Sequence, residues 1–341
     1  MIRMITQPYA QDEWNRIVEG FCDLSLMQTW EYAEAKTGDS SWKVERAIFE
    51  GNDGRVLGAV QAMIRYVPGL GKGLVWISRG PLWRGADETD VSTLVAMMNL
   101  LRQYWVVERG MYLRILPTLF QGEVDSDLFT KSGYRLVDGS ILWASSLLDL
   151  SLPIEVLRSR LQQKWRNCLN KAGRQGIVAQ SGVEDVLFND LLLEYEGMLQ
   201  RKSFVSCSPS LLSRLQSTLP DERKLWVVRG RLGSQSLGGV LIARYGQFCE
   251  YLVGTVNDAG KRINAGQLLL WLAITQMKEQ GYRWFDLGGM DPVRTSKGIM
   301  HFKRGVNGSP YELMGEVESF NRSLLNQAIR WRVRHARNQL N

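Results

Sequence analysis

The chain has 341 residues, of which 45% are hydrophobic and 23% charged, so it can form packed cores and is not a disordered chain. It has no run of about 18 apolar residues and no apolar signal core at its N-terminus. Its 4 cysteines form no CxxC pair, and its 2 histidines make a metal site or Ser-His-Asp catalysis a poor expectation. We therefore expect a cytoplasmic protein without a bound metal or other cofactor.

The net charge of +7 is concentrated in two segments. Residues 158–176 hold six basic residues and no acid, and residues 320–341 hold five basic residues and no acid. Such segments can be ordinary solvated helix faces. They can also bind phosphate groups of a nucleic acid, a nucleotide or an acidic lipid.

The two halves of the chain repeat one order of predicted elements. Residues 43–66 alternate as a hairpin around Asn52-Asp53-Gly54, and residues 224–245 do the same around Gly233-Ser234. Each half continues with an amphipathic helix that ends at a glycine, over about 90–110 and 267–281, and then with a strand. This order predicts a duplicated α/β fold with two units, over 1–148 and 149–317. A final helix over 318–341 has no counterpart and can complete the first unit.

Six segments resemble one known family. They are residues 26–36, 77–83, 166–177, 250–255, 285–289 and 298–308. In this order they resemble the FemABX aminoacyltransferases, of the short type that lacks a coiled-coil arm. The resemblance implies two tandem GNAT-like domains, each a mixed, mostly antiparallel sheet flanked by helices.

The same resemblance implies transfer of an amino acid from aminoacyl-tRNA to an amino group of a peptidoglycan-type cell-envelope precursor. The partners are then aminoacyl-tRNA and a UDP-linked or lipid-linked precursor, and we expect a monomer. Two alternatives stay open. One is an acyl-CoA-dependent N-acyltransferase of the wider GNAT-like group acting on an envelope glycan or small amine, although residues 262–267 fit its pyrophosphate loop only loosely. The other is a protein that binds tRNA or a precursor without catalysis.

Aminoacyl transfer needs a cation or a hydrogen-bond donor at the oxyanion that develops on the ester carbonyl. The resemblance assigns Lys303 to this task, near the donor ester or the terminal phosphates of the tRNA. It assigns Tyr251 to the substrate channel, where a phenol can donate to a carbonyl or phosphate oxygen. The alternatives are a surface lysine at a strand end and a half-buried packing tyrosine. Asp286 can act as a general base or cap the following turn, and we do not assign it a catalytic role.

Five further residues are expected to bind substrate. The resemblance places Lys36 at the diphosphate of the acceptor, with Trp30 on the same segment, and Arg79 can bind the same phosphates or a carboxylate. Tyr195 and Arg201 resemble a helix that borders the substrate channel, although helical spacing alone makes Tyr195 a core residue and Arg201 an exposed one.

The two basic segments have separate expected roles. Arg166, Lys171 and Arg174 are expected to contact tRNA phosphates, which gives salt-sensitive affinity without sequence readout. For the final helix we favour docking on the first unit through its apolar residues, with its arginines in water. The apolar residues are Leu324, Leu325, Ile329 and Trp331. Peripheral contact of this helix with anionic lipid at the inner membrane surface is the alternative.

Overall fold

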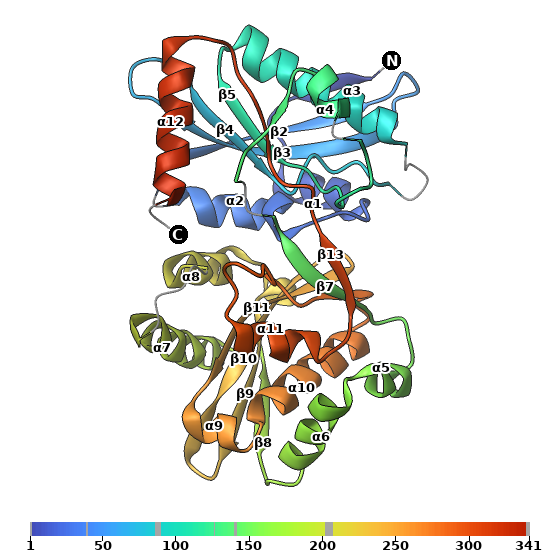
Figure 1. Ribbon diagram of the computed structural model, residues 1–341, viewed down its shortest axis with the longest axis vertical. Helices are drawn as coiled ribbons and strands as arrows, with labels where there is room; N and C mark the ends of the chain where they lie inside the picture. Colours follow the sequence, from blue (N-terminus) through green and yellow to red (C-terminus); the bar gives the residue numbers. More distant parts are fainter. Residues whose placement is uncertain are drawn as a thin grey trace. The chain divides into compact units, whose positions relative to one another are not determined.

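The computed structural model describes residues 2–38, 40–85, 90–125, 127–139, 142–201 and 207–338, with side chains described as far as 335 (Figure 1). The chain divides into two units. The first contains residues 1–143 and 312–341, and the second contains residues 144–311. The side chain of Arg337 lies outside the described residues.

The first unit is built on a seven-stranded sheet in the order β1-β2-β3-β4-β5-β14-β6. Its strands are β1 (Arg3–Thr6), β2 (Trp42–Glu50), β3 (Val56–Tyr66), β4 (Gly73–Ser78), β5 (Tyr112–Leu116), β14 (Val317–Ser319) and β6 (Arg135–Leu136). Its helices are α1 (Gln11–Glu19), α2 (Trp30–Thr37), α3 (Val91–Arg102), α4 (Asp127–Lys131) and α12 (Leu324–Asn338). The predicted cap Asp90 accepts a hydrogen bond from Ser92 N at 2.8 Å, and α3 continues as a π-helical segment, Gln103–Glu108.

The second unit repeats this plan in the order β13-β7-β12-β11-β10-β9-β8. Its strands are β13 (Ser309–Glu312), β7 (Ala144–Asp149), β12 (Trp284–Asp286), β11 (Phe248–Val256), β10 (Gln235–Tyr245), β9 (Trp226–Leu232) and β8 (Val178–Gly182). Its helices are α5 (Ile154–Arg160), α6 (Gln163–Ala172), α7 (Asp185–Arg201), α8 (Pro209–Thr218), α9 (Asp258–Arg262), α10 (Ala265–Glu279) and α11 (Lys297–Arg304).

The pairing confirms the predicted fold class and the internal repeat. In the first sheet an antiparallel hairpin, β2–β3, leads through β4 to the parallel pair β4–β5. In the second sheet β9–β10 leads in the same way through β11 to the parallel pair β11–β12. Each parallel pair is joined by a long helix, α3 or α10, which packs its apolar face on the sheet because a parallel connection must cross the sheet face.

The units do not end where the sequence pattern placed them. Residues 144–148, expected at the end of the first unit, belong to β7, which pairs with β12 of the second sheet. Strand β14, residues 317–319, spans the boundary predicted between the second unit, which was expected to end at 317, and the final helix, and it pairs with β5 and β6 of the first sheet. The first unit is therefore discontinuous in sequence, because its sheet is completed by a strand from the C-terminal segment.

Within the part of the chain that the structure describes, no helix combines the length and apolarity needed to span a bilayer.

Candidate functional site

The Lys303 ammonium lies inside the second unit. Lys303 belongs to the last turn of α11, a helix that Ser296 caps by accepting a hydrogen bond from Ile299 N at 3.4 Å. The Lys303 side chain points inward, so the residue is 6% exposed, and its Nζ donates to Gly289 O at 3.0 Å. The expected alternative, a surface lysine at a strand end, does not describe this buried helical residue.

Burial lowers the pKa of Lys303 to about 8, because an ammonium is less stable away from water. The carboxylates of Asp286 and Glu250 oppose this effect and favour the charged form. Near neutral pH the side chain is therefore mainly an ammonium, yet its pKa is close enough to 7 for it to give up a proton during a reaction.

Asp286 fixes the loop that holds Lys303. It ends β12, is buried, and accepts hydrogen bonds from Ser145 Oγ, from Tyr311 OH and, at 2.8 Å, from Gly288 N. Gly288 has φ +66°, and a Cβ there would lie 2.4 Å from the backbone oxygen of Tyr251. Glycine is required at this position because both the conformation and the close approach exclude a side chain. The next residue, Gly289, supplies the carbonyl that accepts from Lys303.

Glu250 is the second buried carboxylate beside Lys303. It pairs in register with Asp286 across the parallel strands β11 and β12, and it accepts a hydrogen bond from Tyr245 OH at 3.0 Å. Aligned residues on neighbouring strands project to one side of the sheet, so the two carboxylates lie on the same side of the sheet.

Tyr251 lies directly beside Lys303. The ammonium is 5.1 Å from the centroid of the Tyr251 ring, within range of a cation–π contact. Leu241 pairs with Val253 and Ile242 with Tyr251, so β11 carries an extra residue, Leu252, as a bulge. The ring lies along the strand, with its hydroxyl over Gly254, where a Cβ would lie 1.8 Å from the oxygen. Burial raises the pKa of Tyr251, so its phenol stays neutral and can donate a hydrogen bond.

Arg79 occupies a tightly built turn in the first unit. It has φ +51°, an uncommon conformation for a residue with a side chain, and it is buried. Its guanidinium lies 4.6 Å from the centroid of the Trp143 ring. Gln28 braces the turn by donating to Ser78 O at 2.9 Å and accepting from Gln61 N at 2.8 Å. A buried arginine in a strained conformation is typical of a functional position.

Trp30 and Lys36 lie on helix α2. Lys36 is half-buried in the last turn, and Trp30 is half-buried at the first residue. The guanidinium of Arg46 stacks 3.5 Å from the centroid of the Trp30 ring. One face of the indole is therefore occupied, and a ligand can reach Trp30 only by its other face or its edge.

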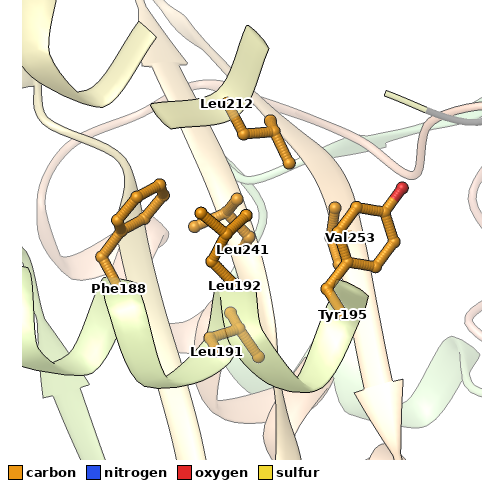
Figure 2. Close-up of a pocket in the computed structure, with 7 residues that line it drawn as sticks. All are labelled: Phe188, Leu191, Leu192, Tyr195, Leu212, Leu241 and Val253. Atoms are coloured by element: carbon orange, nitrogen blue, oxygen red, sulfur yellow. The ribbon is translucent and has the colours of Figure 1, made fainter. Parts of the chain in front are cut away.

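Tyr195 and Arg201 lie on helix α7, and Tyr195 is a packing residue. Figure 2 shows its ring among apolar side chains of α7, α8, β10 and β11; these are Phe188, Leu191, Leu192, Leu212, Leu241 and Val253. The space between them has no room for a water molecule. The Tyr195 hydroxyl donates to Cys207 O at 2.9 Å. Arg201 is exposed at the end of α7, so helical spacing describes both residues.

The basic helix α6 packs against the helix that carries Lys303. Lys171 and Arg174 are exposed, while Arg166 donates to Ser159 O at 3.0 Å and to the side chain of Gln163. On the opposite face of α6, Trp165 is buried and donates through Nε1 to Phe302 O at 3.0 Å. The segment expected to bind tRNA is therefore in direct contact with α11.

Sequence reasoning did not find the groups that support Lys303. Ser145 and Tyr311 contact Asp286 but are 141 and 25 residues from it in sequence. The only indication in the sequence is Asp286 followed by Gly288 and Gly289 at the end of a strand. This pattern predicts that another group lies close to the backbone there, but not which group it is. Among the described residues, no group of three or more His, Cys, Asp or Glu side chains is placed to hold a metal ion.

These features define the class of protein. Both units have the GNAT-like arrangement, and residues 158–304, from α5 to the end of α11, match the family described as an acetyltransferase (GNAT) domain. The chain has a tandem GNAT-like fold, and its second unit contains the segment that matches the acetyltransferase (GNAT) domain. Comparison by sequence with curated proteins finds no match.

The solved structure of FemX shares this tandem fold. The two chains are 16% identical and superpose with a TM-score of 0.79 over 95% of this chain and 99% of FemX. The fold implied by the FemABX resemblance is thereby confirmed.

Two further structures, one described as a putative lysylphosphatidylglycerol synthetase and one as L-PGS, also align with this chain. One is the C-terminal domain of a protein from Agrobacterium fabrum described as such a synthetase, with 13% identity, 85% and 86% coverage of the two chains and a TM-score of 0.51. The other is L-PGS from Bacillus licheniformis, with 14% identity, 87% and 90% coverage and a TM-score of 0.50.

Proposed function

We propose that the protein is an aminoacyl-tRNA-dependent aminoacyltransferase that forms an amide bond on an amino group of a peptidoglycan-type cell-envelope precursor. The observation that carries the proposal is the buried ammonium of Lys303, held by Gly289 O beside the Tyr251 ring. In this reaction the acceptor nitrogen attacks the ester carbonyl, the bond to the tRNA ribose oxygen breaks, the amine loses a proton and the ribose oxygen gains one.

Lys303 suits two steps of this reaction. Its ammonium stabilises the oxyanion that forms on the carbonyl, more strongly in a buried site than in water. With a pKa of about 8, it can also protonate the departing ribose oxygen. The neutral phenol of Tyr251 supplies a second donor for the same oxyanion.

The exposed basic residues of α6 support tRNA as the donor. Lys171 lies in the last turn of α6 and Arg174 lies two residues beyond its end, and both are exposed; the same helix contacts the Lys303 helix through Trp165. A phosphate backbone bound there would lie beside the unit that holds the catalytic lysine. The proposed acceptor residues, Lys36 and Arg79, belong to the first unit, and we place their ligand, the precursor phosphates, there. The reaction is proposed to occur in the cytoplasm.

The names of the related structures agree with this class of reaction. FemX and the structure described as a lysylphosphatidylglycerol synthetase share the fold, and the name of the latter describes attachment of lysine to an envelope lipid. The second candidate, acyl-CoA-dependent N-acylation, is favoured by the acetyltransferase description of residues 158–304. The N-terminus of α10 also supports this candidate, since a helix N-terminus can bind a pyrophosphate. It follows α9 and is preceded by Asn264, which has φ +60°.

A donor screen tests the proposal. The protein is incubated with an extract of envelope precursors and either total tRNA charged with labelled amino acids or labelled acetyl-CoA. We expect label in the product only from charged tRNA, and RNase treatment of the tRNA should abolish it. Label from acetyl-CoA alone, or from neither donor, would overturn the proposed donor.

The variant Lys303→Ala tests the catalytic assignment, and Lys297→Ala is its matched control. Lys297 is an exposed lysine at the first residue of the same helix. We expect Lys303→Ala to reduce transfer by about 100-fold or more while tRNA binding persists. Equal activity of the two variants would contradict a catalytic role for Lys303 and favour a binding protein.

A further inference from the structure

Helix α12 docks on the first unit through polar side chains. It packs against β4 and β5 (Figure 1). Asn326 is buried and donates to Gly110 O at 3.2 Å. Arg330 donates to Glu318 at 2.6 Å, and Arg334 lies 3.5 Å from the same carboxylate. Glu318 is fully buried and also accepts from Tyr112 OH at 2.5 Å.

The outer face of α12 is partly apolar. Leu324 is 84% exposed and Trp331 is 63% exposed, and they are separated by two helical turns on one face. Ala328 and His335 occupy the same face and are exposed, and the His335 ring lies 4.1 Å from the Trp331 ring. The expectation from sequence was that Leu324, Leu325, Ile329 and Trp331 dock and the arginines remain in water. Leu325 and Ile329 are half-buried, but Leu324 and Trp331 are exposed, and Arg330 and Arg334 contact Glu318. The physical reason is Glu318, whose buried charge requires cationic partners from the helix.

The charge on this outer face is positive. Arg322 and Arg332 are exposed, and the chain has no acid from residue 320 to its last residue. In the described part of the chain, two acids lie near arginines of the helix: the buried Glu318, and Asp138, which lies 3.9 Å from Arg334. The outer face thus combines an indole, an aliphatic side chain and cations.

We propose that the outer face of α12, formed by Leu324, Trp331 and the flanking Arg322 and Arg332, binds the surface of an anionic phospholipid bilayer. An indole and a leucine partition into the headgroup region, while the arginines contact lipid phosphates. A nucleic acid would use the arginines but gives no burial to Leu324. A second copy of the same face is disfavoured because its charges repel. This lipid contact does not depend on the transferase activity.

Vesicle flotation of the full chain tests the proposal. The probes are phosphatidylcholine vesicles with and without phosphatidylglycerol, at low and moderate salt. We expect binding only to the anionic vesicles, and we expect the double variant Leu324→Glu/Trp331→Glu to lose at least about tenfold in partitioning. Arg332→Gln should weaken binding about fivefold, as expected for the loss of one cation near an anionic surface.

A matched control separates the helix from general surface properties. Val186 and Leu193 are 72% and 70% exposed on α7 in the second unit, so Val186→Glu/Leu193→Glu adds the same two charges at a similar exposure elsewhere. It should bind vesicles like the native chain, and the melting temperatures of all variants should agree because the changed side chains are exposed. Absence of binding to anionic vesicles, or equal binding by the double variant, would overturn the proposal. Loss of tRNA binding or of self-association by the double variant, with vesicle binding intact, would do so as well.

Discussion

At the scale of single residues, the central feature of the site is the ammonium of Lys303, which is buried although burial disfavours its charge. Lys303 loses most of its hydration, and the carboxylates of Asp286 and Glu250 recover part of the lost free energy. The result is a lysine pKa of about 8. A surface lysine titrates near 10.5, so the proposed role of Lys303 as an acid near physiological pH depends on its buried position.

This pKa predicts how stability changes with pH. The unfolded lysine keeps its proton up to about pH 10.5, whereas the folded lysine loses it near pH 8. Between these values the unfolded state binds more protons, so the free energy of unfolding rises with pH. We expect a rise of roughly 2–3 kcal/mol over this window in the native chain that is absent in Lys303→Met. Urea unfolding of both proteins at about pH 7.5 and about pH 10 measures how much the free energy of unfolding changes between them. Parallel pH profiles would contradict the lowered pKa.

The same pKa predicts a pH dependence of catalysis. If the ammonium of Lys303 protonates the leaving oxygen, kcat/KM should fall about tenfold per pH unit above a value near 8. Lys303→Arg keeps the cation but cannot donate its proton, so its residual activity should show no such fall. Rates measured with a fixed amount of charged tRNA across the range decide this. A native profile that stays flat above pH 8 would exclude proton donation by Lys303.

Residue patterns identified the cation but not its surroundings. Lys303 and Tyr251 were selected through family-like segments, and the structure brings them within 5.1 Å. Sequence could not show that Asp286 is buried, because its partners Ser145 and Tyr311 come from other strands. Tyr195 shows the opposite case, since helical spacing alone places it in the core.

At the scale of elements, the loop after β12 connects the sheet to Lys303 through two hydrogen bonds. Asp286 fixes Gly288, and Gly289 holds the ammonium. The two glycines differ in what surrounds them. A Cβ at 288 would meet the backbone of Tyr251 at 2.4 Å, whereas a Cβ at 289 meets nothing within 4 Å.

This difference predicts opposite outcomes for two similar variants. Gly288→Ala forces a left-handed conformation and a backbone clash, so the loop must move and Lys303 loses its carbonyl partner. We expect a loss of about 2–4 kcal/mol in stability and at least about tenfold in transfer rate. Gly289→Ala should change stability by less than about 1 kcal/mol. Equal stability and activity of the two alanine variants would show that the loop does not position Lys303.

Helix α12 gives a second prediction at this scale. Glu318→Ala leaves Arg330 and Arg334 without their buried partner and removes the acceptor of Tyr112 OH. The two arginines are partly exposed and can be hydrated, so we expect a loss of about 1–3 kcal/mol, mainly from the buried Tyr112 hydroxyl left without its acceptor. Arg332→Ala, an exposed position on the same helix, should cost less than about 0.5 kcal/mol. Chemical denaturation followed by tryptophan fluorescence compares the two. A small loss for Glu318→Ala would mean that α12 does not stabilise the first unit.

Most elements could be predicted from sequence because their patterns are local. The hairpin β2–β3, the cap at Asp90 and the long helix α10 follow from turn residues, capping and apolar periodicity. The side of α12 that docks could not be predicted in this way. It depends on Glu318, a residue outside the helix whose burial only the folded sheet reveals.

At the scale of the whole molecule, the first unit is made of two separate segments of the chain, and the second unit lies between them in sequence. The repeated pattern predicted two consecutive units, and the repeat itself is present in both sheets. The missing information was strand exchange at the ends, where β14 inserts between β5 and β6. Three residues with buried side chains carry no periodicity that would reveal a pairing with strands about 200 residues earlier.

This discontinuity predicts how fragments fold. Residues 144–311 contain a complete sheet and its own apolar core, so this fragment should fold and melt cooperatively alone. Residues 1–143 alone lack β14, an interior strand, and lose the partner Glu316 of the buried Arg114. They should therefore remain unfolded or aggregate, and fusing residues 312–341 to them through a glycine-serine linker should restore folding. Circular dichroism melts of the three fragments measure this. A cooperative melt of residues 1–143 alone would show that β14 and α12 are dispensable, and an unfolded 144–311 fragment would show that the second unit depends on the first.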